Sequence, residues 1–276
     1  IDFADLEITI EKTISEVHKL KQGLEATRNL IAVQHELQVA SRIQESILPK
    51  TFPPFPDRHD IEIFATMTPA RQVGGDFYDF FFIGEDRLAF VIGDVSGKGV
   101  PAALFMAVCR TLIKATALHN DCPDTCLNYV NRLLCGDNAS DLFVTVFYGV
   151  LNTKTGEVSY SNAGHNPPYW VRRNGTPPSP LQNQGGIVLG VMPEATYVKN
   201  SITLAPGECL FLYTDGVTEA MDKDRHLFCD TRLEEHLTKA CALPLDEMAL
   251  GLARVIEAFT VNYPQHDDIT MLAVRF

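Results

Sequence analysis

The sequence predicts a layered α+β domain, with β-sheets packed face to face and helices outside them, preceded by a long helix. Many short apolar segments have strand character and are separated by hairpin turns such as "GEDR" and "NTKTGE". The helical segments come in consecutive pairs, unlike the strand-helix alternation of a parallel sheet. Apolar residues at heptad spacing in the first 48 residues are typical of a coiled coil.

Residues 1–48 are expected to form the long helix and to serve as a linker or dimerisation segment. The apolar stripe repeats every seven residues, at Phe3, Ile10, Val17, Leu24 and Ile31, with Leu6 and Leu20 at the complementary positions. From Leu30 it continues one residue out of frame, through Val33, Leu37, Ala40 and Ile47. Such a break changes supercoil winding. Two arrangements stay open: the helix packs on its own domain, or two copies pair as a parallel homodimer that transmits an upstream signal.

Prolines end this helix. Leu48-Pro49, followed by Pro53, Pro54 and Pro56, predicts a stiff linker over residues 49–60, because proline cannot continue a helix and restrains the residue before it. The catalytic candidate is the domain over residues 61–276.

Strands and helices follow within that domain. We expect strands at residues 61–68, 77–83, 88–92, 142–151, 156–162, 168–173, 201–204, 209–214 and 269–276. We expect helices at residues 101–118 and 123–134, and over 231–262 in two pieces split near Pro244.

Charge and cysteine content restrict the partners and the compartment. The 23 Lys and Arg against 35 Asp and Glu give a formal charge of −12, without a basic patch for nucleic acid or anionic lipid. Seven cysteines without zinc-site spacing indicate structural thiols in a reducing cytoplasm. No signal peptide is evident, and no apolar run approaches the roughly 20 residues that span a bilayer. Since the chain opens without Met inside a helical pattern, we expect an upstream sensor, anchored in the inner membrane, in a longer protein.

Acidic residues next to glycine or another turn former stand at several strand ends. They are Asp76, Asp94, Asp215 and the pair Asp267-Asp268. Each alone is typical of a turn or a helix cap. Ionised carboxylates at the ends of buried strands, however, need a cation or hydrogen-bond donors to compensate them. Several such sites in one domain suggest a shared cation, and all-oxygen ligation suits Mg²⁺ or Mn²⁺.

Two glycine-rich stretches resemble parts of known nucleotide-binding motifs. Gly74-Gly75-Asp76 matches the first three positions of the GGDEF signature of diguanylate cyclases, which keeps a cyclase open as a remote alternative. "GDVSGKGVPAAL" leads into an apolar helix and could present N–H groups to an anion. It lacks the GxxxxGK[ST] spacing of a P-loop, so that class is excluded.

Six ordered blocks, "VGGDFYDF", "FVIGDVSGKGVPAAL", "NAGHNPPY", "GIVLGV", "LFLYTDGVTEA" and "DDIT", resemble the PPM family of metal-dependent serine/threonine phosphatases over residues 61–276. The most similar branch is the bacterial SpoIIE/RsbU type, and "ELQVASRIQESILP" resembles its linker helix. The resemblance implies a four-layer β-sandwich flanked by helices. It also implies two Mn²⁺ or Mg²⁺ ions at one edge, with a third, weaker ion left open.

The resemblance also implies roles for individual residues. Asp94 would bridge both ions, Asp76 and the Val95 carbonyl would serve one of them, and Asp215 with Asp267 would hold the other. Asp268 would act through a water or support these ligands. A water activated by the ions would attack phosphorus directly, without a phospho-enzyme.

Further residues have weaker signals. Arg71 is a phosphate-binding candidate, because a guanidinium matches a phosphoryl group. Asp79 is expected on the opposite strand face from Asp76, and Asp79 and Glu219 are candidates only for supporting the ligands. His165 in "NAGHNPPY" is expected to be a structural hydrogen-bonder. Val95-Ser96 stands where animal members of the family have a histidine, so water is the expected proton source for the leaving group.

This branch implies a phosphorylated STAS-type regulator, such as an anti-sigma antagonist, as the substrate. We expect the register of the N-terminal helix to gate activity by positioning the helix at 101–118. The main alternative is a catalytically silent module that uses the same fold to bind a partner.

Overall fold

The computed structural model describes residues 3–136, 141–173, 176–182, 185–261 and 263–276, with side chains from Lys12 onward. The chain divides into two compact units, Ile1–Ile43 and Gln44–Phe276.

The smaller unit is helical throughout its described part and belongs to α1 (Phe3–Ile47), which confirms the predicted long helix. Its apolar stripe is open to solvent: Leu20 and Leu24 are each 73% exposed and Ile31 is 60% exposed. The heptad side chains of Phe3, Leu6 and Ile10 lie outside the described residues. Pairing of this helix in a coiled coil stays a prediction.

The larger unit contains two five-stranded antiparallel sheets, with the orders β1-β10-β9-β6-β7 and β2-β3-β4-β5-β8. The strands are β1 (Glu62–Thr68), β2 (Phe77–Ile83), β3 (Arg87–Val95), β4 (Val144–Asn152), β5 (Glu157–Ala163), β6 (Tyr169–Val171), β7 (Ser179–Pro180), β8 (Asn200–Thr203), β9 (Cys209–Tyr213) and β10 (Ile269–Arg275).

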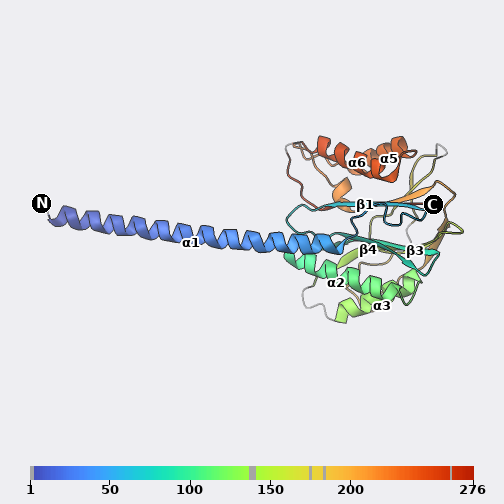
Figure 1. Cartoon of the computed structure of the whole chain (residues 1–276), viewed down its shortest axis with the longest axis horizontal. Helices are drawn as coiled ribbons and strands as arrows, with labels where there is room; N and C mark the ends of the chain where they lie inside the picture. Colours follow the sequence, from blue (N-terminus) through green and yellow to red (C-terminus); the bar gives the residue numbers. More distant parts are fainter. Residues whose placement is uncertain (1–2, 137–140, 174–175, 183–184, 262) are drawn as a thin grey trace. The chain divides into compact units, whose positions relative to one another are not determined.

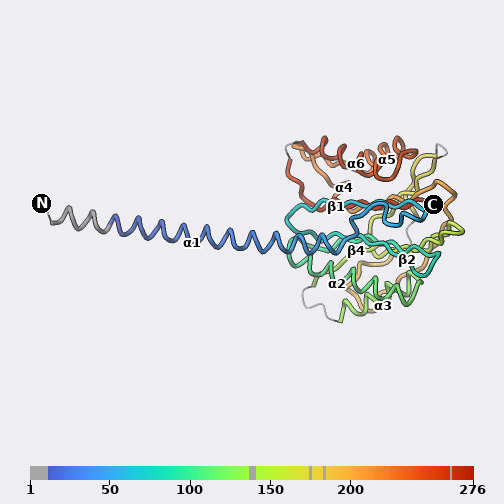
Figure 2. The backbone as a smooth tube through the Cα atoms, in the orientation of Figure 1, coloured from blue at the N-terminus to red at the C-terminus, as the bar shows by residue number. Residues whose placement is uncertain are grey.

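Helices cover the outer faces of both sheets. They are α2 (Val100–Ala117), α3 (Pro123–Gly136), α4 (Asp215–Thr218), α5 (Cys229–Ala240) and α6 (Leu245–Phe259). Figure 1 shows the four layers: α5 with α6, the sheet containing β1, the sheet containing β3 and β4, and α2 with α3. The short α4 contacts α5 and β10 (Figure 2). The predicted α+β class and four-layer sandwich are therefore confirmed.

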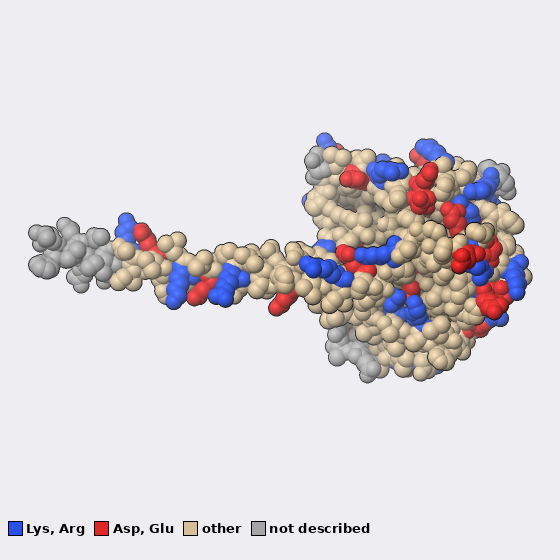
Figure 3. Space-filling model, viewed as in Figure 1, with Lys and Arg blue, Asp and Glu red and all other residues tan. Residues whose placement is uncertain are grey.

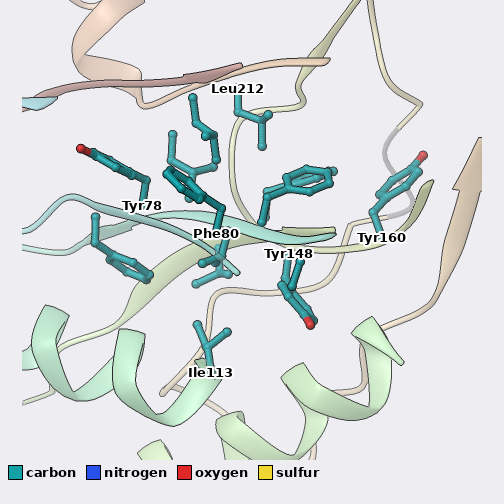
Figure 4. Close-up of a cluster of buried hydrophobic side chains, with 14 of the residues drawn as sticks. Tyr78, Phe80, Ile113, Tyr148, Tyr160 and Leu212 are labelled. Atoms are coloured by element: carbon teal, nitrogen blue, oxygen red, sulfur yellow. The ribbon is translucent and has the colours of Figure 1, made fainter. Parts of the chain in front are cut away.

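The second sheet is covered on both faces, which explains the nearly continuous apolar runs of β2 and β3. Between the sheets, Phe80 of β2 and Leu212 of β9 belong to one buried cluster (Figure 4). On the helical side, Tyr148 of β4 and Ile113 of α2 extend the same cluster. Burial on both sides fixes the register of these strands, because a slip of one residue would exchange the two faces.

Most predicted elements are present with ends shifted by a few residues. Sequence periodicity missed β7 and α4, which are too short to show a repeat. The last helix ends at Phe259 rather than at residue 262, which lies outside the described residues. Among the described helices, α2 alone has the length and apolar composition of a membrane span, and it packs on α3, β2 and β3.

Candidate metal centre

Four predicted aspartates converge at one end of the two sheets. Asp76 and Asp94 occupy facing positions just beyond the last pair of the β2–β3 ladder. Asp215 opens α4 directly after β9, and Asp267 lies just before β10, the neighbour of β9. The charges of Asp215 and Asp267 both act on Asp94, so residues from both sheets share one site.

Two glycines allow these segments to approach. A Cβ on Gly75 would lie 2.8 Å from the carbonyl oxygen of Val95, and a Cβ on Gly216 would lie 2.0 Å from that of Asp268. Neither position leaves space for a side chain. The backbones therefore touch, and the Val95 carbonyl lies against the segment that carries Asp76.

Burial and mutual repulsion disfavour ionisation of these carboxylates. Burial, with the charges of Asp94 and Asp268, raises the pKa of Asp76 well above its usual range. Burial and the charge of Asp215 raise the pKa of Asp94 to about 7. The pKa of Asp215 is also raised, by burial and then by Glu219 and Asp267. A cluster of this kind binds cations because a divalent ion removes the repulsion.

The donor set fits a hard divalent cation. It consists of carboxylate oxygens and one available backbone carbonyl, the ligands that Mg²⁺ and Mn²⁺ prefer. Among the ion pairs of the described residues, only Lys98 places a cationic side chain on one of the four aspartates, with Nζ 2.8 Å from Oδ2 of Asp267. Lys98 also donates to the backbone oxygen of His266. Sequence analysis did not single out Lys98, although it lies within "GDVSGKG".

Thr214 orients the most buried ligand candidate. Its Oγ1 donates to Oδ2 of Asp76 (2.8 Å) and accepts from the N–H of Thr270 (3.0 Å). The hydroxyl therefore ties the carboxylate to the β9–β10 pair. Sequence analysis missed this role.

Asp268 holds the loop that leads to Asp76. Its carboxylate accepts the N–H groups of Ala70 (2.8 Å) and Gly75 (2.7 Å), and more weakly that of Asp76 (3.4 Å). The side chain is only 7% exposed. Both carboxylate oxygens are thus engaged in shaping the loop, which is a supporting role.

Arg71 and Glu219 lie at the exposed edge of this region. Nη1 of Arg71 is 3.9 Å from the position that a Cβ on Gly99 would take, next to the start of α2. Glu219 follows α4 and, with Lys98 and Asp267, lines a cavity of about 710 Å³ bordered by α6. The end of the domain that carries the four aspartates therefore has exposed side chains at its edge and a cavity beside Asp267.

Asp79 points away from the four aspartates. It is fully buried on β2, where its Oδ2 lies 2.7 Å from Arg110 Nη2 and 3.2 Å from Lys114 Nζ, both on α2. Its carboxylate therefore fixes α2 to the second sheet.

His165 is buried beside Thr145, whose Oγ1 lies 2.8 Å from Nδ1. Burial lowers the pKa of His165 to about 4, so the ring is neutral near pH 7. Thr145 in turn pairs with Asp94 across the β3–β4 ladder, so the ring supports that strand end.

The family described as "Stage II sporulation protein E (SpoIIE)" matches residues 84–276. The chain belongs to the SpoIIE family. Together with relatives that are named phosphoserine phosphatases, this match confirms the resemblance to a PPM-type phosphatase of the SpoIIE/RsbU branch and the enzyme class, a protein phosphatase.

Two relatives of this SpoIIE-family chain cover most of it. Protein IcfG of Synechocystis sp. is 34% identical over 266 residues, which are 87% of this chain and 41% of IcfG. Phosphoserine phosphatase RsbU of Bacillus subtilis is 26% identical over 249 residues, which are 88% of this chain and 70% of RsbU. The chain therefore spans less than half of IcfG.

A solved structure shows the same fold. The SiaA-PP2C domain of Pseudomonas aeruginosa superposes with a TM-score of 0.78 at 24% identity, covering 89% of this SpoIIE-family chain and 97% of that domain.

Proposed function

We propose that this chain is a metal-dependent phosphatase that removes phosphate from serine or threonine of a regulatory protein. The observation that carries this proposal is the convergence of Asp76, Asp94, Asp215 and Asp267, with the pKa of Asp76, Asp94 and Asp215 raised by burial and repulsion. When bound there, two Mn²⁺ or Mg²⁺ ions supply an activated water and Lewis-acid stabilisation of phosphoryl charge.

Different side chains would bind the ions and the substrate. Asp94 interacts with Asp76 and with the charges of Asp215 and Asp267, and it would therefore contact both ions. Asp76 and the Val95 carbonyl would hold one ion, and Asp215 and Asp267 would hold the other. The exposed Arg71 would bind phosphoryl oxygens through its paired N–H donors. We assign the leaving-group proton to water, because burial keeps His165 neutral.

A phosphorylated STAS-type protein is the substrate that we propose. The support is membership of the SpoIIE family and the similarity to RsbU, which is named a phosphoserine phosphatase. Figure 3 shows acidic and basic side chains interspersed on the visible face of the larger unit, as suits a protein partner better than nucleic acid. With seven unpaired cysteines, we place the domain in the cytoplasm.

We also propose homodimerisation through α1 and gating of the metal centre by its register. The exposed apolar stripe on α1 supports dimerisation, since such a stripe is stable in water when a second helix covers it. The ion pairs of Asp79 fix α2 to β2, so a displacement of α2 would be transmitted to the strand that follows Asp76. Fusion to an unrelated zipper in each of the two heptad frames tests gating; equal activity in both frames would contradict it.

The experiment for the phosphatase proposal is hydrolysis of p-nitrophenyl phosphate with Mn²⁺ and with EDTA. Asp94→Ala and Asp215→Ala should abolish Mn²⁺-dependent turnover, whereas Asp57→Ala, at an exposed aspartate beside the β2–β3 hairpin and so at the other end of β2 from Asp76, should retain it. Folded protein without turnover of this compound or of a phosphorylated STAS protein would favour the silent binding module. Turnover of GTP would instead favour the cyclase.

A further inference from the structure

The side chain of Gln44, in the last turn of α1, makes two hydrogen bonds to one backbone residue of the metal-site loop. Its Nε2 donates to the carbonyl of Gly74 at 2.6 Å, and its Oε1 accepts the N–H of Gly74 at 3.0 Å. The side chain is 7% exposed, and Gln44 belongs to the larger unit. The amide therefore pairs with Gly74 as a neighbouring strand residue would.

Gly74 needs such a partner. It is buried in the segment between β1 and β2, outside the described strand ladders. Buried backbone N–H and C=O groups are almost always hydrogen-bonded, and each unpaired group carries the cost of lost solvation. The amide of Gln44 satisfies both groups of Gly74 at once.

The opposite side of Gly74 is fixed by Asp268. A Cβ on Gly74 would lie 2.3 Å from Asp268 Oδ2, and that same oxygen accepts the N–H of Gly75. The Gly74-Gly75 backbone is thus held between an amide from α1 and a carboxylate from the β10 side. The next residue is Asp76, whose carboxylate is oriented further by Thr214.

The helix end that carries Gln44 is itself anchored. Leu48 is 7% exposed and belongs to the main core cluster, and the hydroxyl of Tyr78 donates to the carbonyl of Pro49 at 2.7 Å. These contacts fix where the last turn of α1 ends. The position of Gln44 is consequently fixed both by these contacts at the end of α1 and by its hydrogen bonds to Gly74.

We propose that Gln44 is a positioning residue for the metal centre, acting through Gly74 to place Asp76 as a ligand. This inference rests on the proposed metal-dependent function. Through Gln44 and Gly74, the end of α1 would be connected to the ligand candidate Asp76 without the involvement of α2. Changes in helix register that withdraw the amide would loosen the Asp76 loop and weaken ion binding.

The test is Mn²⁺ binding by isothermal titration calorimetry to the full chain and to Gln44→Met, which keeps the side-chain length and removes both hydrogen-bonding groups. We expect the Kd for Mn²⁺ to rise on the order of tenfold, since two buried groups lose their partners. Gln38→Met makes the same change at an exposed position of α1. This control should stay within about twofold of the parent chain.

Hydrogen–deuterium exchange of residues 69–78 without metal supplies a second readout. Gln44→Met should accelerate exchange in this segment, and Gln38→Met should leave it unchanged. If Gln44→Met does not fold, Gln44→Asn, whose amide is one methylene too short, takes its place in both measurements.

Unchanged Kd and unchanged exchange in the Gln44 variant, beside a parent chain that binds Mn²⁺, would overturn the assignment of Gln44 alone. A parent chain that does not bind Mn²⁺ would overturn the proposed function and this inference with it. Equal weakening by Gln38→Met and Gln44→Met would reduce Gln44 to a general structural contact.

Discussion

Asp79 of β2 and Arg110 of α2 form a buried ion pair, with Oδ2 2.7 Å from Nη2, and the carboxylate of Asp79 is fully buried. Lys114 adds a second cation at 3.2 Å. Arg110 is only 13% exposed, so its charge depends on Asp79 for compensation. The pair joins the helix that follows the Asp94 loop to the strand that follows Asp76.

Asp79→Asn should therefore destabilise the domain without weakening metal binding. Removing one partner of a buried pair leaves an uncompensated charge, and we expect the free energy of unfolding in urea to fall by about 3 kcal/mol. The Kd for Mn²⁺ of the folded variant should stay unchanged, because Asp79 lies apart from the four aspartates. Asp79→Leu combined with Arg110→Met should recover most of the stability; an unstable double variant would contradict this account.

Lys98 and Asp267 form a contact that a metal ion has to compete with. Lys98→Met removes a positive charge 2.8 Å from a ligand candidate, so Mn²⁺ should bind about two- to fivefold more tightly, the size of a partly exposed ion pair. Lys98→Arg keeps the charge and should bind Mn²⁺ like the parent chain. Weaker binding by Lys98→Met would mean that the ammonium orients Asp267 rather than competing for it.

Metal binding should depend on pH through Asp94. Its pKa of about 7 in the metal-free protein lies above the usual value near 3.9, so below pH 7 a proton increasingly occupies the site. Mn²⁺ must displace that proton, and affinity should fall as pH drops from 8 to 6. Calorimetry at pH 6 in two buffers of different ionisation enthalpy should show proton release. The same binding enthalpy in both buffers would contradict the raised pKa.

The ligand candidates could be predicted from sequence because each stands beside a glycine or at the end of a buried strand, where an ionised carboxylate needs a partner. Asp94 and Asp76 are typical. The residues that contact these ligand candidates could not be predicted, because the contacts join distant segments of the chain. Thr214 reaches Asp76 across 138 positions, and Lys98 reaches Asp267 across 169. Local sequence patterns do not reveal contacts between residues so far apart in the chain.

For the fold, too, local sequence patterns predicted individual elements but not the contacts between distant ones. Apolar runs predicted the buried strands, and alternation placed Asp79 on the face opposite Asp76. The period of a strand indicates a face but not which helix will cover it, so Arg110 was not foreseen as its partner. Gln44 was hidden for a similar reason: it lies in a helix whose apolar stripe dominates the pattern, and its role depends on the backbone of Gly74.

Arg71 should contribute to substrate binding and not to metal binding. Its guanidinium is exposed beside the start of α2, and among the described hydrogen bonds and ion pairs none engages it, so its donors are available to a phosphoryl group. Arg71→Ala should raise the KM for p-nitrophenyl phosphate about tenfold, the effect of losing a charge-assisted hydrogen bond. Arg71→Lys keeps the charge but loses the paired donors, so its KM should lie between those of the parent chain and Arg71→Ala.

The control for Arg71 is Arg254→Ala, because Arg254 is also exposed and lines the cavity that reaches Asp267. Its removal should leave the KM of this small substrate unchanged, and neither variant should alter the Kd for Mn²⁺. A larger rise in KM for Arg254→Ala than for Arg71→Ala would transfer the phosphate-binding role to α6. The substrate would then approach the four aspartates from the cavity rather than from the start of α2.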